Sequence, residues 1–209
     1  MIMLYIFDEI DLLDDDFPEN VSDLLSIERR EKVQRLSKIH GKKASAVVYL
    51  LLRLTLKDIY GINEIIEFDY NSMQKPYLQK YPQIFFNFSH SHNAGACAAA
   101  SYEIGVDVQQ IVVVKENVAR RVLTVDEFST FKSVENPNEY FCKAWTIKES
   151  YLKLTGQGIS DELRDISVVG IQDKMIYRGR DYFCCVCGSG AKAMQIKHIG
   201  RDDFEQLRN

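Results

Sequence analysis

The chain has 209 residues, 46% of them hydrophobic and 27% charged, with a formal net charge of −4. This balance is typical of a globular protein with one domain or two small lobes, and the negative charge argues against a nucleic-acid partner. No apolar run reaches the roughly 18 residues that span a membrane, and acidic residues stand where a signal peptide is basic, so we expect a cytoplasmic protein.

The first half of the chain predicts a strand, an acidic loop, two helices and a set of strands. Ser22 is the expected cap of the first helix, and Gly61 is the residue type that follows a helix C-terminus. Alternating apolar and polar residues indicate the strands. The expected segments are a strand at 3–7, a loop at 8–20, helices at 24–40 and 42–60, strands at 65–70 and 84–91, a turn at 91–96 and a continuous strand at 96–111.

The second half predicts the same kinds of element, and its second helix ends at Gly156. Residues 50–62 resemble residues 144–159, which suggests internal duplication. We therefore expect an α+β fold of two lobes, 1–102 and 103–209, joined by continuous strand near residues 100–105. The expected segments are helices at 116–133 and 138–155 and strands at 166–171, 174–179, 182–190 and 192–199.

The cysteines indicate a reducing compartment. Five is an odd number for a disulfide framework, and three of the five are crowded into the segment CCVC at 184–187. That segment lacks the second ligand pair of a zinc site at zinc-finger spacing. Buried free thiols in a strand are the preferred interpretation over a metal site.

The segment EIGVDVQQI at 103–111 places polar side chains that could bind a ligand on one face of a strand. Apolar residues share one face, and the other carries Gly105, Asp107 and Gln109. A glycine beside a carboxylate and an amide allows a ligand to approach the backbone. An exposed strand face with an ordinary Asp explains the same pattern, and so this segment alone leaves both interpretations open.

Two further patterns are also ambiguous. Glu149 and Lys153 lie four residues apart on one helical face with Trp145, which fits either a site or a surface ion pair. Eight basic side chains between residues 29 and 43 suggest a phosphate site or a solvated helix face balanced by acids. They are Arg29, Arg30, Lys32, Arg35, Lys38, His40, Lys42 and Lys43.

Taken in order, these segments resemble the larger monomeric class of 4′-phosphopantetheinyl transferases, typified by the surfactin-synthetase-activating (Sfp-type) enzyme. That family has a Ser-His strand motif, then G-V/I-D-x-E, then W-x-x-K-E-S/A-x-x-K. The corresponding residues here are Ser89-His90, GVDVQ at 105–109 and WTIKESYLK at 145–153. Lys75-Pro76 matches a short K-P element, and the resemblance covers about residues 25 to 160.

The resemblance implies two similar lobes of about 100 residues in a pseudo-twofold arrangement, with coenzyme A in the cleft between them. It implies a monomer that moves phosphopantetheine from coenzyme A to a serine hydroxyl of an acyl or peptidyl carrier protein. Coenzyme A contacts are then expected from the basic helix, the K-P element and the Ser-His strand. These residues are Arg29, Lys32, Lys43, Lys75, Pro76, Ser89 and His90.

The resemblance also implies a metal site and a catalytic set. Asp107, Glu149 and Gln109 would ligate Mg²⁺, with Mn²⁺ as the alternative, and Asp107, Glu149 and Lys153 would be catalytic. Many family members have Glu where this chain has Gln109. An amide carries no charge and cannot act as a base, so a water is the alternative third ligand, and the base assignment moves toward Glu149.

An acidic carrier protein is the expected partner. The apolar run 111–114, followed by Lys115, Arg120 and Arg121, is a candidate docking surface, although the same residues fit a strand end and a solvated helix. Two alternatives remain at this stage. One is a coenzyme A or nucleotide-binding module without turnover, and the other is an interaction protein whose basic helix docks an acidic partner.

Overall fold

The structure, a computed structural model, describes residues 2–156, 161–188 and 193–208 and has a mixed α and β architecture. Short 3-10 helices occupy 10–12, 22–24, 161–165 and 201–208. The strands are β1 Ile2–Phe7, β2 Asp69–Tyr70, β3 Pro76–Tyr77, β4 Phe85–His90, β5 Gly95–Ala100, β6 Gly105–Gln110, β7 Lys174–Arg178, β8 Tyr182–Cys187 and β9 Met194–His198. The helices are α1 Phe17–Asn20, α2 Ile27–Arg35, α3 Ile39–Tyr60, α4 Glu116–Val122, α5 Val125–Ser133 and α6 Pro137–Thr155.

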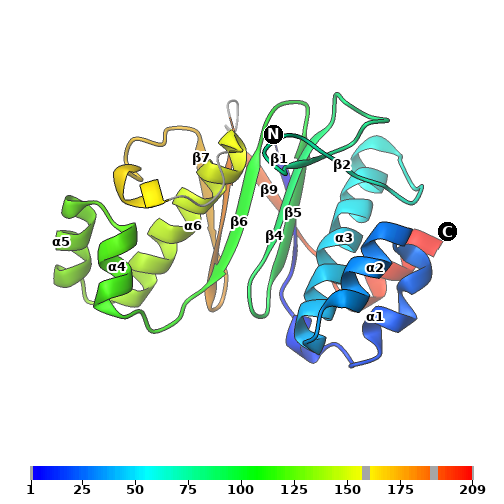
Figure 1. Cartoon of the computed structure of the whole chain (residues 1–209), viewed down its shortest axis with the longest axis horizontal. Helices are drawn as coiled ribbons and strands as arrows, with labels where there is room; N and C mark the ends of the chain where they lie inside the picture. The colour runs from blue at the N-terminus through cyan, green and yellow to red at the C-terminus, as the bar shows by residue number, and fades with distance from the viewer. Residues whose placement is uncertain (1, 157–160, 189–192, 209) are drawn as a thin grey trace.

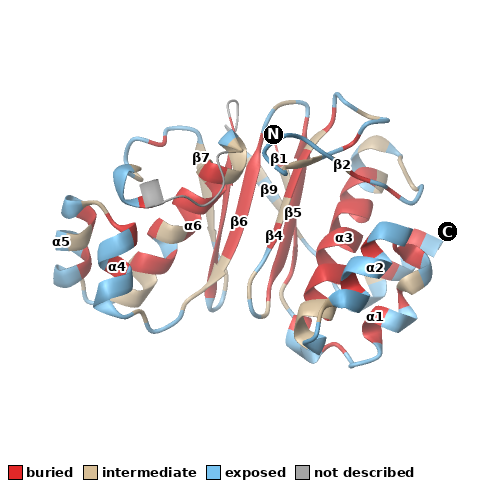
Figure 2. Ribbon diagram, viewed as in Figure 1, coloured by how far each residue is buried: buried red, intermediate tan, exposed pale blue. Residues whose placement is uncertain are grey.

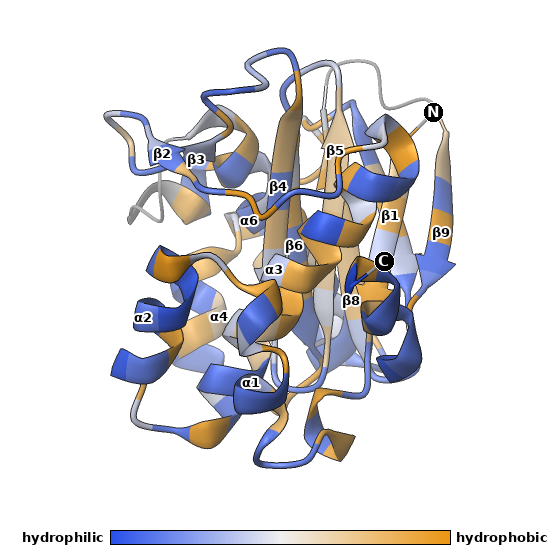
Figure 3. Ribbon diagram, turned by 90° about the vertical axis from the view of Figure 1, so that its right-hand side faces the viewer, coloured by the Kyte–Doolittle hydropathy of each residue, from blue (hydrophilic) through white to orange (hydrophobic). Residues whose placement is uncertain are grey.

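Two sheets stand side by side in the middle of the molecule (Figure 1). The first has the strand order β4-β5-β1-β9, and the second has the order β6-β8-β7. β1 is antiparallel to β5 but parallel to β9, which lies at the sheet edge (Figure 3). The strands β2 and β3 form a separate small hairpin.

The sheets pack face to face, and helices cover their outer faces (Figure 2). The interface between the sheets is built from small and branched apolar side chains, which alternate along each strand and so form one buried layer. Helix α3 packs on β5 and β4, whereas α6 packs on β6 and β8. The result is four layers with a helical layer on each outside. No described helix is long and apolar enough to cross a membrane.

Both long helices end as the sequence predicts. Gly61 follows α3 with φ of 68°, and Gly156 follows α6 with φ of 73°. This left-handed conformation is strained for residues with a Cβ, so glycine is the natural residue to end each helix. The predicted free thiols are confirmed, since all five cysteines are buried and unbridged.

Several sequence-based boundaries are wrong. Helix α2 is capped by Ser26, whose hydroxyl accepts a hydrogen bond from the backbone N–H of Arg29, and not by Ser22. The helix expected at 116–133 is two helices, because Thr124 and Glu127 form a capping box that starts α5. Residues 65–68 and 166–171 are not strands.

The strand expected at 96–111 is interrupted at residues 101–104 and supplies a different sheet on each side of the break. Apolar periodicity continues across this break because both strands are buried, so the pattern alone does not reveal it. The break coincides with the predicted lobe boundary at residues 102 and 103. However, β9 pairs with β1 in the first sheet, so the last strand crosses back to the first half of the chain.

Candidate active site

Polar side chains join the two sheets where β4 runs beside β6. The side-chain oxygen of Asn87 accepts a hydrogen bond from the backbone N–H of Val106 at 2.8 Å. The hydroxyl of Ser91 accepts one from the backbone N–H of Gln110 at 2.9 Å. Asn87 lies in β4 and Ser91 directly follows it. Their hydrogen bonds link the two strands where no backbone ladder does, and so set how β6 lies against β4.

Asp107 lies between these two links and is buried. Its Oδ1 accepts hydrogen bonds from the hydroxyl of Ser89 at 2.9 Å and from Nζ of Lys153 at 2.7 Å. Lys153 also donates to the Ser89 hydroxyl at 2.7 Å. Burial raises the pKa of Asp107, although Lys153 and Ser89 act in the opposite direction.

Glu149 reaches the same point from α6. A Cβ on Gly105 would lie 2.0 Å from the carbonyl oxygen of Ser150, so this glycine lets α6 pack directly on β6. Glu149 is buried, and burial followed by the neighbouring charge of Asp107 raises its pKa to about 7. The two sequence-predicted carboxylates are therefore brought together in a site that excludes much of the solvent.

These carboxylates keep oxygen atoms available for a ligand. Oδ2 of Asp107 and Oε1 of Glu149 are buried and have no hydrogen-bond partner among the described residues. Buried anionic oxygens without partners are costly, and a hard divalent cation is the ligand that carboxylates suit best. These two carboxylate oxygens therefore fit a cation such as Mg²⁺.

Gln109 stands one strand repeat beyond Asp107 and is half-buried. Its Nε2 makes only a long contact of 3.5 Å with the carbonyl oxygen of Gln110. The backbone carbonyl of Gln109 accepts from the thiol of Cys142 on α6 at 3.1 Å. This hydrogen bond holds the backbone of β6 at Gln109 against α6. The role of the Gln109 amide in metal binding stays a prediction.

Four basic side chains from three helices surround His90 at the end of β4. Desolvation lowers the pKa of His90, and the charges of Lys153, His40, Lys32 and Arg29 lower it further. These groups come from α6, α3 and α2, which are distant in sequence. A concentration of cations around an imidazole at a strand end is a favourable environment for a phosphate group.

Arg29 is an unusual member of this group because it is buried. Its guanidinium lies 5.4 Å from the ring centroid of Tyr49 and 5.5 Å from those of Phe68 and Phe88, and it donates to the Ser45 hydroxyl at 3.3 Å. Arg29 forms no ion pair within the described part of the chain, and burial lowers its pKa. Its charge is therefore not neutralised by a carboxylate.

Two other lysines of the predicted set are engaged elsewhere. Nζ of Lys43 pairs with Asp15 at 2.6 Å. Nζ of Lys75 pairs with Glu103 at 2.5 Å and donates to the carbonyl oxygen of Leu154 at 3.2 Å. Lys75 thus ties the β2–β3 hairpin to the end of α6, and Lys43 is not among the cations around His90.

A cavity of about 310 Å³ lies between this hairpin and α6. The K-P element, Glu149 and Lys153 all line this cavity. Its lining residues are Met73, Gln74, Lys75, Pro76, Asn87, Phe88, Glu149, Leu152, Lys153 and Gly156. The cavity thus reaches Glu149 of the carboxylate pair and two residues of β4, and it is a candidate ligand pocket.

Comparison with known proteins gives the family of the chain. Residues 103–196 match the 4′-phosphopantetheinyl transferase superfamily. A 4′-phosphopantetheinyl transferase from Bacillus subtilis is 31% identical over 69% of this chain and 66% of its own length. The transferase psf-1 from Bacillus pumilus is 28% identical over 68% and 62%, and Sfp from Bacillus subtilis strain 168 is 29% identical over 76% and 72%.

The chain belongs to the 4′-phosphopantetheinyl transferase superfamily. The resemblance expected from the motifs is thereby confirmed. The aligned segment spans about two thirds of the length of the curated relatives it matches.

A second groove of about 370 Å³ lies at the C-terminal end of β6, beside α6. Its walls include Gln109, Trp145 and the run from Val112 to Val114. Val113 is 88% exposed, so this part of the predicted docking surface is apolar and open to solvent. Arg120, in contrast, pairs with Glu116 at 2.7 Å and is not a free charge.

Sequence reasoning missed the residues that support the site. No role was predicted for Asn87 or Ser91, although their spacing from Ser89 places all three on one strand face. Lys148, inside the predicted helical motif, is fully buried and pairs with Glu127 at 2.6 Å. It anchors α6 to α5, a role that no spacing along one helix could reveal.

Proposed function

We propose that this protein transfers 4′-phosphopantetheine from coenzyme A to a serine hydroxyl of an acyl or peptidyl carrier protein. The new bond joins the serine oxygen to the phosphorus that bears pantetheine. The bond that breaks lies within the pyrophosphate, and adenosine 3′,5′-bisphosphate leaves. The observation that carries this proposal is the buried pair Asp107 and Glu149, with unpartnered oxygens beside Lys153 and the cations around His90.

Asp107 and Glu149 would hold Mg²⁺, or Mn²⁺ in its place, with Gln109 or a water as a further ligand. When bound, the cation supplies positive charge to the pyrophosphate oxygens, which otherwise repel an incoming nucleophile. The fit is supported by the unpartnered carboxylate oxygens of both residues.

Glu149 is the best candidate for the general base. A carboxylate whose pKa is about 7 is partly ionised at neutral pH and can accept the serine proton. Lys153 would neutralise charge that develops on the leaving phosphate. The position of its Nζ, 2.7 Å from the Ser89 hydroxyl and from Oδ1 of Asp107, supports this role because it puts a cation beside the carboxylate pair.

The cations around His90 would receive the 3′-phosphate of coenzyme A. Lys32 is exposed, and Arg29 contributes a buried charge that no described carboxylate neutralises. The cavity beside Lys75 and Pro76 would accommodate another part of the ligand. Lys43 is a weaker candidate, since Asp15 already pairs with it.

The two-lobe arrangement belongs to this proposal. Each half, 1–102 and 103–209, contributes a long helix that ends at a left-handed glycine and packs on its own sheet, which supports a pseudo-twofold relationship. The site would then lie where the lobes meet, along β4 and β6. A cytoplasmic monomer acting on an acidic carrier completes the proposal.

The decisive test incubates the protein with coenzyme A, Mg²⁺ and an apo-carrier protein and follows the carrier by intact mass spectrometry. We expect the mass gain of one phosphopantetheine group. Asp107→Ala and Glu149→Ala should each lower the rate by at least about 100-fold, because each removes a charged ligand. Glu139→Ala is the matched control on α6, since Glu139 pairs with Arg178 at the surface.

Absence of transfer with any carrier class, together with measurable coenzyme A binding, would leave only a binding module. Normal turnover in a folded Asp107→Ala variant would remove the carboxylate pair from the site.

A further inference from the structure

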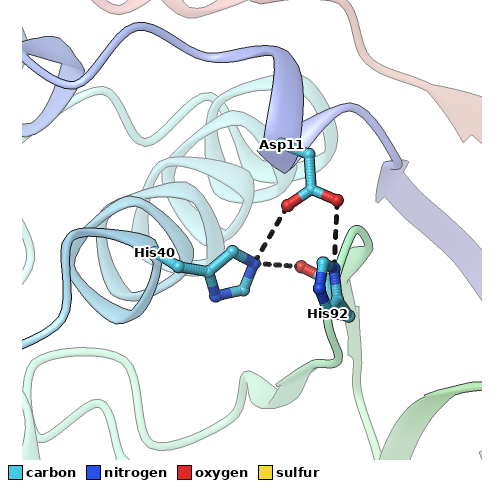
Figure 4. Close-up of side chains that lie close together, drawn as sticks. All are labelled: Asp11, His40 and His92. Atoms are coloured by element: carbon cyan, nitrogen blue, oxygen red, sulfur yellow. Dashed lines mark hydrogen bonds and ion pairs between the residues drawn. The ribbon is translucent and has the colours of Figure 1, made fainter.

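Three potential metal ligands from separate segments meet near one end of the first sheet (Figure 4). Asp11 lies in the short helical turn after β1, His40 in the first turn of α3, and His92 in the turn between β4 and β5. One ligand atom from each residue lies within 4.8 Å of the other two. None of these residues belongs to the carboxylate pair, although His40 is also one of the groups around His90.

The separations fit a small, tetrahedral metal centre. Nε2 of His40 lies 3.4 Å from Oδ1 of Asp11, and Nδ1 of His92 lies 3.0 Å from Oδ2 of Asp11. Ligand atoms bound to Zn²⁺ at about 2.0–2.1 Å in a tetrahedron are about 3.3 Å apart. The carboxylate therefore sits between the two imidazoles, and small rotations of the rings bring all three ligands to one point.

The backbone holds two of the ligands in place. The backbone N–H of Asp11 donates to the side-chain oxygen of Asn93 at 2.9 Å, and that of Ile10 donates to the Asn93 carbonyl oxygen at 3.2 Å. The backbone N–H of Ser91 donates to the carbonyl oxygen of Ala94 at 2.8 Å, which closes the turn that carries His92. Asp11 and His92 are thus fixed to each other before any ion binds.

We propose that Asp11, His40 and His92 bind a divalent transition-metal cation of the Zn²⁺ class. Two imidazole nitrogens and one carboxylate oxygen are borderline ligands, which favour Zn²⁺, Co²⁺ or Ni²⁺ over Mg²⁺. Three protein ligands leave one position for water, in keeping with the exposure of Asp11 and His92. The cation ties the segment after β1 to the start of α3 and to the β4–β5 turn.

The competing explanation is a cluster held by protonated histidines alone. His40 also donates from Nε2 to the carbonyl oxygen of His92, and a positive imidazole beside Asp11 is an ordinary ion pair. The two explanations differ in pH dependence. Acid weakens metal binding, because protonated imidazole cannot ligate, whereas it strengthens an ion pair with a carboxylate.

The test uses the full chain without a polyhistidine tag, after treatment with a chelator, at about pH 7.5 where free imidazole is neutral. Calorimetric titration with ZnCl₂ should show saturable binding of one ion per chain. Free Zn²⁺ at 100 times its Kd should raise the Tm by roughly 5 to 10 °C. Excess Mg²⁺ should not displace it.

Three variants and one control assign the ligands. Asp11→Asn, His40→Gln and His92→Gln should each weaken Zn²⁺ binding by about tenfold or more. His198→Gln is the control, since His198 lies on β9 beside Tyr177 and should leave the affinity unchanged. Co²⁺ should give visible d–d bands without a thiolate charge-transfer band.

Three results would overturn the proposal. One is the absence of saturable binding at about pH 7.5. The second is binding that all three variants leave unchanged. The third is a thiolate band, which would assign the ion to cysteines. None of these measurements depends on transfer activity, so failure here leaves the proposed transferase function standing.

Discussion

Replacing Glu149 by Gln tests the electrostatics of the carboxylate pair directly. The ordinary pKa of this side chain is 4.5, and burial followed by Asp107 raises it to about 7. A pKa raised in the folded state means that the stability contributed by the protonated carboxyl is present below pH 4.5 and is lost as the pH rises to about 7. The loss amounts to about 3 kcal/mol above that range.

Gln is neutral and nearly the same shape, so it avoids this loss. We expect Glu149→Gln to exceed the wild type in free energy of unfolding by up to about 3 kcal/mol at about pH 8, with the difference falling toward zero at about pH 4. In melting temperature this is roughly 6 to 12 °C at the higher pH. The variant should nevertheless lose transfer activity.

The assay is urea unfolding followed by the fluorescence of Trp145, the single tryptophan, across the pH range and in the presence of a chelator. Glu139→Gln on the outer face of α6 is the matched control and should show no such pH-dependent gain. Adding Mg²⁺ should stabilise the wild type but not Glu149→Gln, because the cation needs both carboxylates. A difference in stability that is independent of pH, or a wild type that is the more stable protein at about pH 8, would refute the reasoning.

Other predictions concern the metal strand, the phosphate group and the carrier surface. Gln109→Ala should raise the Mg²⁺ concentration needed for half-maximal transfer, and it should lower the transfer rate less than Asp107→Ala does. If both variants lower the rate equally, the amide has a role other than that of a neutral metal ligand. Lys32→Ala should raise the KM for coenzyme A but not for dephospho-coenzyme A, with Arg35→Ala on the same helix as control, and equal changes for both substrates would place the phosphate elsewhere. Val113→Asp should raise the KM for an acidic carrier by about tenfold without changing that for coenzyme A, because it places a like charge in an exposed apolar patch; an unchanged carrier KM would exclude this surface.

Local chemistry explains which parts of the fold could be predicted. Gly61 and Gly156 end the long helices because only local backbone sterics decide that conformation. The alternation around Asp107 was also predictable, since successive side chains in a strand must point to opposite faces. Ser22 misled the prediction of the helix start because Ser26, four residues later, offers the same capping oxygen.

Breaks between buried elements were not predictable in the same way. Residues 101–104 interrupt an apolar run that both sheets bury, so hydrophobic periodicity continues while the backbone changes sheets. The need for Gly105 arises only when Ser150 on α6 approaches it. The parallel pairing of β9 with β1 joins residues near opposite ends of the chain, and no local signal encodes it.

The sequence by itself determined which acids, bases and amides this protein has and which of them share a face of one strand or helix. Spacing suffices for that because strand and helix geometry repeat regularly. Only the tertiary structure decided which charged side chains are neutralised by ion pairs within the protein and which are left to interact with a ligand. Lys43 and Lys75 are equally basic in sequence, yet carboxylates hold both, whereas Arg29 is buried without one. The pKa of Glu149 likewise depends on desolvation and on a neighbour from another element, and electrostatic energies depend on distance through space.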